Sequence, residues 1–374
     1  MMALLEDSHT GFPQVAFPRL PMTIQRYVCA FPVLLFTAQL AALAQQSLPS
    51  VPLPSHGISI AVSVDTKSGQ PVTSLSEKDF TVLDNKTPRP ITSFKILTPP
   101  AEPVHVILLL DAVNLPYEAL AYTREGVEKY LKSNEGALAD PTTIAILTDK
   151  GVQIANGFST NGNALNDSFR NQQIGLREIN RSSEWSGPER LQICIDAFRQ
   201  LATFAGGLPG RKAVIWISAG WPLVSGPRIY LDAQQEDQIF NNVVLFSNQL
   251  RQNEMTIYNV NPWGVGESLE RADYYQTFLK APTRPGEAEL GDLAVQVLAV
   301  HTGGLAIESN SDVIGNIERC LADLRSWYQI VFDPLPADKP NEYHHIEVHL
   351  DQRDLVARTT DGYYADQRAL DPQH

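Results

Sequence analysis

The sequence predicts an α/β fold with a doubly wound, six-stranded, mostly parallel sheet, and a small all-β accessory domain built from the N- and C-terminal strands. Three observations support this prediction. Two apolar runs, Val104–Leu110 and Ala213–Ser218, are typical of strands buried on both faces. Strand-like and helix-like segments alternate between residues 104 and 325, as in a parallel sheet covered by helices. Outside that region the apolar residues alternate with period two.

The region 57–98 is predicted to form the N-terminal part of the accessory domain. Its apolar residues alternate along short segments separated by turn residues such as Asp65–Gly69 and Asp84–Lys86. Pro99, Pro100 and Pro103 then mark a stiff boundary. The predicted strands are Ile58–Val64, Phe80–Leu83 and Ile91–Leu97.

The region 104–325 is predicted to form the α/β domain, with right-handed crossovers between its strands. Leu191–Phe204 has the pattern of a strong amphipathic helix, which Gly206 and Gly207 end. A hairpin is expected around Asp149–Gly151. The predicted strands are 104–110, 142–147, 152–155, 213–218, 256–260 and 305–307, and the other predicted helices are 117–131, 238–250, 290–300 and 313–324.

The region 326–365 returns to period two, and residues 366–374 form a tail. The predicted strands are Tyr328–Phe332, His345–Leu350 and Val356–Thr359. Three strands before the α/β domain and three after it are each too few for a stable sheet. We therefore expect one shared β-sandwich, with the α/β domain inserted between its halves.

The N-terminal region has the architecture of a signal peptide. Arg26 precedes an uncharged apolar segment, Tyr27–Ala44, which ends in Ala42-Leu43-Ala44. The interpretation is a signal peptide with an upstream extension over residues 1–44, cleaved before Gln45, and a flexible Pro- and Ser-rich linker over residues 45–56. The chain is then secreted, periplasmic or held in the cell envelope. An uncleaved membrane anchor is the alternative, because about 18 apolar residues lie at the lower limit for spanning a bilayer.

The charge balance argues against a nucleic-acid partner. The chain has a formal net charge of −13 and a pI near 5.1. Phosphate binding draws its affinity from clustered Lys and Arg, which are missing here. A hydrophobic content of 43% is enough for a real core, so the chain is not disordered.

Asp111 is the first candidate for a functional residue. It follows the apolar run that starts at Val104, where the predicted central strand ends. Ligands of open α/β sheets gather beyond the carboxyl ends of the strands, so a carboxylate at this position is placed to meet one.

Three short motifs around this strand carry a resemblance. They are Asp79-Phe80-Thr81-Val82, Asp111-Ala112-Val113-Asn114, and the turn and strand from Pro209 to Trp216 with Gly210-Arg211-Lys212. In their order, these motifs resemble a von Willebrand factor type A (vWA) domain, and more narrowly the secreted VWFA-related proteins of acidobacteria, over residues 57–365.

The resemblance implies a metal-ion-dependent adhesion site for Mg²⁺: Asp-x-Ser-x-Ser after the first strand, a Thr from a later loop and a late Asp. Here Val113 and Leu115 replace the two serines, and Ala219 replaces the late Asp. The site is therefore expected to be degenerate. The oxygen ligands that remain are those of Asp111, Asn114, Ser186, in the Thr role, and Ser218, which would hold Mg²⁺ weakly. The alternative is that Asp111 accepts hydrogen bonds from backbone amides at the start of the following helix.

Two further groups of residues are candidates for a contact surface or a metal site. Trp185, Trp221 and Trp263 fall in loops at the carboxyl edge of the sheet, where exposed aromatics indicate a protein-contact surface; filling of loop cores is the alternative. His345, Glu347 and His349 share one strand face, which favours a solvated surface over a zinc site.

The cysteines and the absent motifs complete the prediction. Cys29 lies in the signal segment, and Cys194 and Cys320 lie on apolar helix faces as buried residues, with a disulfide between them left open. Neither a phosphate loop nor a Gly-x-Ser-x-Gly elbow is present.

We expect a non-enzymatic protein-interaction module for adhesion or scaffolding, with an unidentified protein partner. A metal-dependent hydrolase and a purely structural envelope protein are the alternatives.

Overall fold

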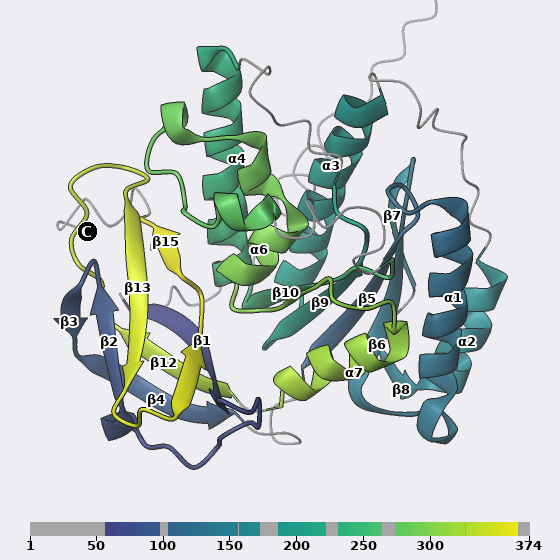
Figure 1. Cartoon of the computed structure of the whole chain (residues 1–374), viewed down its shortest axis with the longest axis horizontal. Helices are drawn as coiled ribbons and strands as arrows, with labels where there is room; N and C mark the ends of the chain where they lie inside the picture. The colour runs from purple at the N-terminus through teal and green to yellow at the C-terminus, as the bar shows by residue number, and fades with distance from the viewer. Residues whose placement is uncertain are drawn as a thin grey trace, which may run out of the picture. The chain divides into compact units, whose positions relative to one another are not determined.

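A computed structural model describes residues 57–97, 104–155, 157–172, 186–221, 231–263, 274–325 and 327–365, which lie within one compact unit of the chain (Figure 1). The predicted signal peptide and linker, residues 1–56, and the tail, residues 366–374, lie outside the described residues. Among those described, no helix combines the length and the apolar character needed to cross a bilayer.

The α/β part is built on a mostly parallel sheet, as predicted. Strand β5 lies between β9 and β6, and β10 and β11 continue the parallel order beyond β9. β7 and β8 both pair with β6 in antiparallel orientation. The strands are β5 (His105–Asp111), β6 (Ala137–Thr148), β7 (Gly151–Ile154), β8 (Ser159–Asn161), β9 (Lys212–Ile217), β10 (Met255–Val260) and β11 (Ala306–Ile307).

The sheet has seven strands among the described residues, so the prediction of six was wrong. The seventh strand is β8, a short polar segment that shows no alternation in the sequence. It forms because β6 begins at Ala137, five residues before the predicted start, and this extension offers a free edge. β8 pairs there, with Ala137 opposite Asn161 and Thr142 opposite Ser159.

Helices cover both faces of this sheet, as a doubly wound fold requires (Figure 1). Successive residues of a strand point to opposite faces, so Ile107 and Leu109 belong to one core and Leu108 and Leu110 to the other. The first core is completed by α3 (Ser186–Gly206), α4 (Ala233–Gln252) and α6 (Val295–His301), and the second by α1 (Tyr117–Lys132), α2 (Gly162–Asn171) and α7 (Val313–Asp323).

Two helix predictions need correction. The segment predicted as one helix over residues 290–300 contains a 3₁₀ turn, Leu290–Leu293, and then α6, because Ala294 has an extended backbone between them. Helix α2 was not predicted. Cys194 and Cys320 are buried free thiols in the two different cores, so they are not joined in a disulfide.

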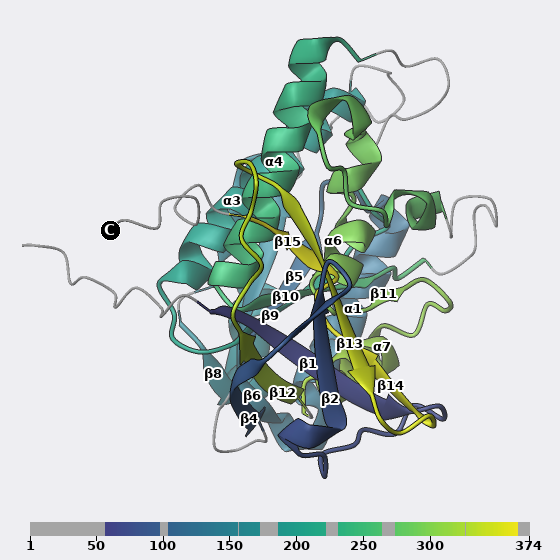
Figure 2. The ribbon, with the colours of Figure 1, turned by 90° about the vertical axis from the view of Figure 1, so that its left-hand side faces the viewer.

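The β-sandwich part consists of two four-stranded sheets that share strands from both ends of the chain. β1 pairs with β12 and β14, and β2 pairs with β13 (Figure 2). The first sheet contains β14 (Leu355–Arg358), β1 (Ile58–Thr66), β12 (Trp327–Phe332) and β4 (Ile91–Leu97); the second contains β15 (Gly362–Tyr364), β13 (Tyr343–Leu350), β2 (Phe80–Asp84) and β3 (Thr87–Arg89).

Each half therefore contributes four strands and not the three that were predicted. β3 and β15 are the additional strands, three residues each, which is too short for a periodic signal. The side chains between the two sheets form a third apolar core, to which Val62, Phe80, Tyr328 and Ile346 belong. Burying one such aliphatic or aromatic side chain stabilises the fold by about 1.5–3 kcal/mol.

Candidate functional site

Asp111, the residue singled out by its position at the end of β5, is fully buried and saturated with hydrogen bonds. Its Oδ1 accepts from the backbone amides of Val113 (3.1 Å) and Asn114 (2.9 Å). Its Oδ2 accepts from Asn114 Nδ2 (2.8 Å), Trp216 Nε1 (3.2 Å) and Ser218 Oγ (2.8 Å). The predicted alternative, hydrogen bonding to backbone amides at the start of the following helix, is confirmed in part: Asp111 accepts from backbone amides, but these belong to the turn before α1, which begins at Tyr117.

The carboxylate is positioned by the two central strands. β5 ends at Asp111, and its neighbour β9 carries Trp216, with Ser218 directly after its last residue. Burial raises the pKa of Asp111, and the hydrogen bonds from Asn114, Ser218 and Trp216 oppose that rise because they favour the charged form. Burial also raises the pKa of the Cys194 thiol, whose Sγ accepts a hydrogen bond from Asn114 Nδ2 (3.1 Å).

The fit of a Mg²⁺ ion can be tested against these contacts. The indole and amide N–H groups that face Asp111 have no lone pair for a cation. Val113 and Leu115 are buried in the core, on opposite faces of the sheet. Asn114 Oδ1 is buried without a hydrogen-bond partner and is one oxygen that remains. These groups are mostly hydrogen-bond donors, which suit a carboxylate as their acceptor. They do not supply the six oxygen ligands that Mg²⁺ prefers.

The structure therefore brings together three of the four predicted ligands: Asp111, Asn114 and Ser218. Ser186 is the first residue of α3, and its side chain is not among those described. Within the described ranges, no three or more His, Cys, Asp or Glu residues are grouped in a way that could hold a metal ion.

The predicted tryptophan surface is only partly described. Trp221 is 6% exposed and packs edge-on against Trp216, with ring centroids 5.4 Å apart. It is therefore a core residue, which corrects the prediction of an exposed contact surface at this position. Trp263 is half-buried against the core that contains Leu108, and Trp185 lies outside the described residues. Tyr117, the first residue of α1, is 73% exposed at the carboxyl edge and was missed. Its signal was an aromatic residue directly after Pro116, at a helix start.

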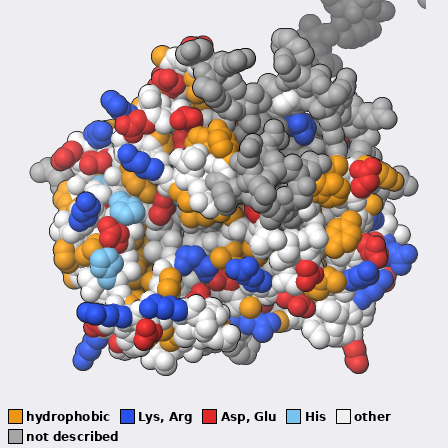
Figure 3. All heavy atoms as spheres, in the orientation of Figure 1, with side chains coloured by type: hydrophobic (Ala, Val, Ile, Leu, Met, Phe, Trp, Pro, Cys, Tyr) orange, Lys and Arg blue, Asp and Glu red, His pale blue; other side chains and the backbone are white. Residues whose placement is uncertain are grey.

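The histidine face of β13 is solvent-accessible, as predicted. His349 Nε2 lies 3.0 Å from Glu347 Oε2, and His345 Nε2 lies 3.7 Å from Glu347 Oε1. Figure 3 shows histidine side chains at the surface of the sandwich part, among acidic and basic groups. The neighbouring His344 is instead buried: its Nδ1 lies 2.9 Å from Asp84 Oδ1, and Tyr363 donates a hydrogen bond to Asp84 Oδ2 (2.8 Å).

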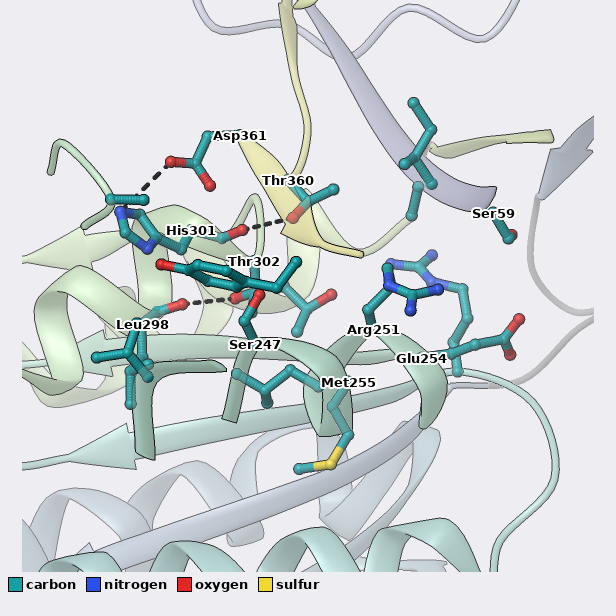
Figure 4. Close-up of a pocket in the computed structure, with 18 of the residues that line it drawn as sticks. Ser59, Ser247, Arg251, Glu254, Met255, Leu298, His301, Thr302, Thr360 and Asp361 are labelled. Atoms are coloured by element: carbon teal, nitrogen blue, oxygen red, sulfur yellow. Dashed lines mark hydrogen bonds and ion pairs between the residues drawn. The ribbon is translucent and has the colours of Figure 1, made fainter. Parts of the chain in front are cut away.

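A second candidate site is a cavity of about 80 Å³ at the opposite, amino end of the parallel sheet (Figure 4). Its walls come from the C-terminal half of α4, from α6 and from strands of the sandwich. Sequence reasoning missed it, because the cavity exists only where the two parts of the chain meet, and because ligands of α/β sheets are expected at the carboxyl edge.

No protein-family model matches the sequence, and no curated protein matches it. Solved structures with some similarity include proximal thread matrix protein 1 from the mussel byssus (13% identity, TM-score 0.29, covering 60% of this chain and 48% of that one). Manganese-loaded TRAP protein from Plasmodium vivax has 8% identity and a TM-score of 0.32, covering 75% and 98%. The pilus adhesin SpaC from Lactobacillus rhamnosus GG has 8% identity and a TM-score of 0.32, covering 79% and 49%.

The chain thus spans about half the length of the mussel protein and of the pilus adhesin. At these TM-scores, the similarities carry no argument about function. The class of protein is defined by the architecture itself, a mixed α/β fold with a mostly parallel sheet and attached antiparallel sheets.

Proposed function

We propose that this chain is an exported, vWA-like protein-interaction module of the acidobacterial VWFA-related type, with a degenerate metal site and no enzymatic activity. The observation that carries the proposal is the hydrogen-bonded state of Asp111. A vWA-type adhesion site needs this carboxylate as a metal ligand, whereas here it accepts five hydrogen bonds from protein donors. The carboxylate then stabilises the carboxyl edge of the sheet and does not recruit a ligand through Mg²⁺.

The proposed contact surface is the carboxyl edge beside the start of α1. Tyr117 presents an aromatic ring with a polar hydroxyl to solvent, and tyrosine is among the residues enriched in the energetic centres of protein interfaces. The half-buried Trp263 lies in the loop after β10, at the carboxyl end of that strand. The net charge of −13 favours a partner whose contact surface is neutral or basic.

A hydrolytic function is disfavoured by the same contacts. Asp111 is fully buried, so it cannot reach a substrate from the edge of the sheet. His345 and His349 are half exposed or more beside Glu347 on an open strand face, whereas small-molecule sites bury most of the surface of their ligand.

The test measures partner capture and metal binding with purified protein. Protein that lacks residues 1–44 is used to capture binding partners from an envelope extract, with Mg²⁺ or with EDTA. We expect capture to survive chelation, to fall at least fivefold in Tyr117→Ala, and to be unchanged in Tyr122→Ala, a matched control because Tyr122 lies on the same helix and is 48% exposed. Capture that EDTA abolishes would contradict the metal-independent proposal, and unchanged capture by Tyr117→Ala would contradict the proposed surface.

Calorimetric titration with Mg²⁺ and Mn²⁺ tests the metal site directly. We expect no micromolar binding by the protein. Micromolar binding that is lost in Asp111→Asn would mean that Asn114, Ser186 and Ser218 complete a functional site.

Export is tested separately. N-terminal sequencing of the native protein should find Gln45 as the first residue. A membrane-bound form that begins at Met1 or Met22 would support the anchor alternative.

A further inference from the structure

The cavity at the amino end of the parallel sheet has the features of a small-molecule site. It is lined by residues from distant parts of the sequence: from α4 and the start of β10, from α6, and from β1, β12, β13 and β15 of the sandwich. Its volume of about 80 Å³ has room for about six water-sized groups, at 10–15 Å³ for each. Such cavities at the junction of two structural parts are preferred places for ligands.

Most of the surface that faces the cavity is apolar. Figure 4 shows Met255 and Leu298 below the open space. Burial of a hydrocarbon chain against these side chains removes apolar surface from water, which favours binding. The buried aliphatic residues and methionine of the lining are Ile60, Leu97, Val243, Leu250, Met255 and Leu298.

The charged groups of the lining are close to balance. Two arginines, Arg211 and Arg251, line the cavity together with three carboxyl groups, those of Glu254, Asp292 and Asp361. Burial raises the pKa of Asp292 to about 7, so at pH 6 this group is mostly protonated and neutral. The two arginines then stand against the two remaining carboxylates, and their formal charges cancel.

The balance of charge favours a neutral ligand. Asp361 Oδ2 lies 3.4 Å from His301 Nε2, and the guanidinium of Arg211 lies 4.2 Å from the ring centroid of Trp327, so these groups have partners within the protein. A small ion of either sign would bring into the cavity a charge for which the lining holds no surplus of the opposite sign. Burying an uncompensated charge is costly.

One polar group beside the open space is available to a ligand. Ser247, from the middle of α4, lines the cavity (Figure 4), and its hydroxyl makes no hydrogen bond with another described residue. The hydroxyls of Thr302 and Thr360 differ, because they donate to the backbone oxygens of Leu298 (2.9 Å) and His301 (2.7 Å). A serine hydroxyl both donates and accepts, so a hydroxyl group is a suitable partner for Ser247.

We infer that this cavity binds a small neutral alcohol, whose hydroxyl group pairs with Ser247 and whose short hydrocarbon part lies against Met255 and Leu298. This site is independent of the carboxyl edge and of the proposed protein partner, because it lies at the opposite end of the sheet. Either proposal can therefore fail without the other.

The chain contains a built-in reporter for the test. Of its four methionines, Met1, Met2 and Met22 precede Gln45, so protein that starts at Gln45 has Met255 alone, in the cavity wall. Such protein, labelled with methyl-¹³C methionine, gives one methyl resonance. It is titrated at pH 6 with 1-butanol, butyrate and butylammonium, which have similar size and different charge.

We expect 1-butanol to shift the Met255 resonance saturably. Butyrate and butylammonium should both bind at least about fivefold more weakly, because each carries a charge that the lining does not balance. No saturable shift with 1-butanol would overturn the proposal and would mean that the cavity holds only water. Tighter binding of either ion would overturn the neutral class of ligand.

Two exchanges test the role of Ser247. Ser247→Ala removes the hydroxyl and should weaken 1-butanol binding about threefold or more, as expected for the loss of one hydrogen bond. Ser168→Ala is the matched control, because it removes an exposed serine hydroxyl from another helix, α2, and should bind 1-butanol normally. Unchanged 1-butanol binding by folded Ser247→Ala would contradict the proposed contact.

A larger side chain tests the location of the site. Ser247→Leu fills the cavity from α4 and should abolish the shifts caused by all three probes. Persistent shifts in this variant would place the binding elsewhere and overturn the proposal. If Ser247→Leu does not fold, Ser247→Ala and the comparison of the three probes on the parent protein still decide the outcome.

Discussion

At the scale of single residues, buried carboxylates dominate the chemistry of this protein, and their partners decide what each can do. Asp111 is fully buried and receives five hydrogen bonds, which offset part of the cost of burying its charge. Asp292 is buried to a similar degree but accepts one described hydrogen bond, from the Glu289 amide (2.8 Å). The two residues differ in local partners and not in residue type.

Asp292 should make stability depend on pH. Burial raises its pKa to about 7 from 3.8. Its contribution is therefore fully present below about pH 4 and is lost as the pH rises through 7, because the folded state resists the charge. Asp292→Asn should be more stable than the parent protein above pH 7, with a difference that grows by at most about 1.4 kcal/mol for each pH unit between pH 4 and 7. Urea denaturation from pH 5 to 8.5 measures this difference.

Asp354→Asn is the control for this series, because that side chain is 96% exposed. The control should track the parent protein at every pH. A constant difference between Asp292→Asn and the parent protein across the series would show that the charge of Asp292 is not the cause.

At the scale of elements, one cluster joins α7 to the sandwich. Asp323, at the end of α7, accepts a hydrogen bond from Tyr258 of β10 (2.7 Å) and pairs with Arg358 of β14. Arg358 also donates to Ser63 Oγ of β1 (3.0 Å), and Trp327 of β12 donates to the backbone oxygen of Asp323 (2.5 Å). Elements of both parts thus meet at a single carboxylate.

Removing this charge should loosen the junction. Asp323→Asn keeps the shape but leaves the Arg358 charge without its carboxylate, and we expect a loss of about 3 kcal/mol, the lower end for a buried pair, because Arg358 is partly exposed. Lys67→Ala is the matched control, since it breaks an exposed pair with Asp354 and should cost about 0–1 kcal/mol. Urea denaturation compares the two variants. An equal loss of unfolding free energy in both would contradict a special role of Asp323 at the junction.

At the scale of the whole molecule, the sandwich depends on both ends of the described chain. β1 has β12 on one side and β14 on the other, so both of its neighbours come from the C-terminal region. β2 likewise pairs with β13. The α/β part between them must therefore bring the two ends together before the sandwich is complete.

A chain truncated after Leu324 should fail to stay monomeric. The truncation removes β12, β13, β14 and β15, which leaves β1 without its described neighbours and exposes its edges to other chains. We expect aggregation in size-exclusion chromatography. A chain truncated after Ala365, which keeps every described strand, should elute as a monomer. A soluble, monomeric and equally stable Leu324 truncation would contradict the dependence on a shared sandwich.

Much of the architecture could be predicted because long apolar patterns depend on local periodicity. The strands over residues 105–111 and 212–217 are buried on both faces, as their uninterrupted apolar runs indicated. The short strands β3, β8 and β15 could not be predicted, because three residues are too few for a periodic signal and each strand is defined by its pairing with a neighbouring edge. The burial of Trp221 could not be predicted either, because it depends on a contact with Trp216, which lies five residues earlier and on a different element.

The sequence alone determined the α/β class, the mostly parallel sheet and the importance of Asp111 as the carboxylate at the end of the central strand. These features follow from periodicity and from the position of a polar residue after an apolar run. Only the tertiary structure decided that Asp111 is enclosed by Trp216 and Ser218, and that Arg211, Arg251 and Met255 line a cavity against the sandwich. Both results depend on contacts between residues far apart in the chain, and the packing of whole elements, not local pattern, sets those distances.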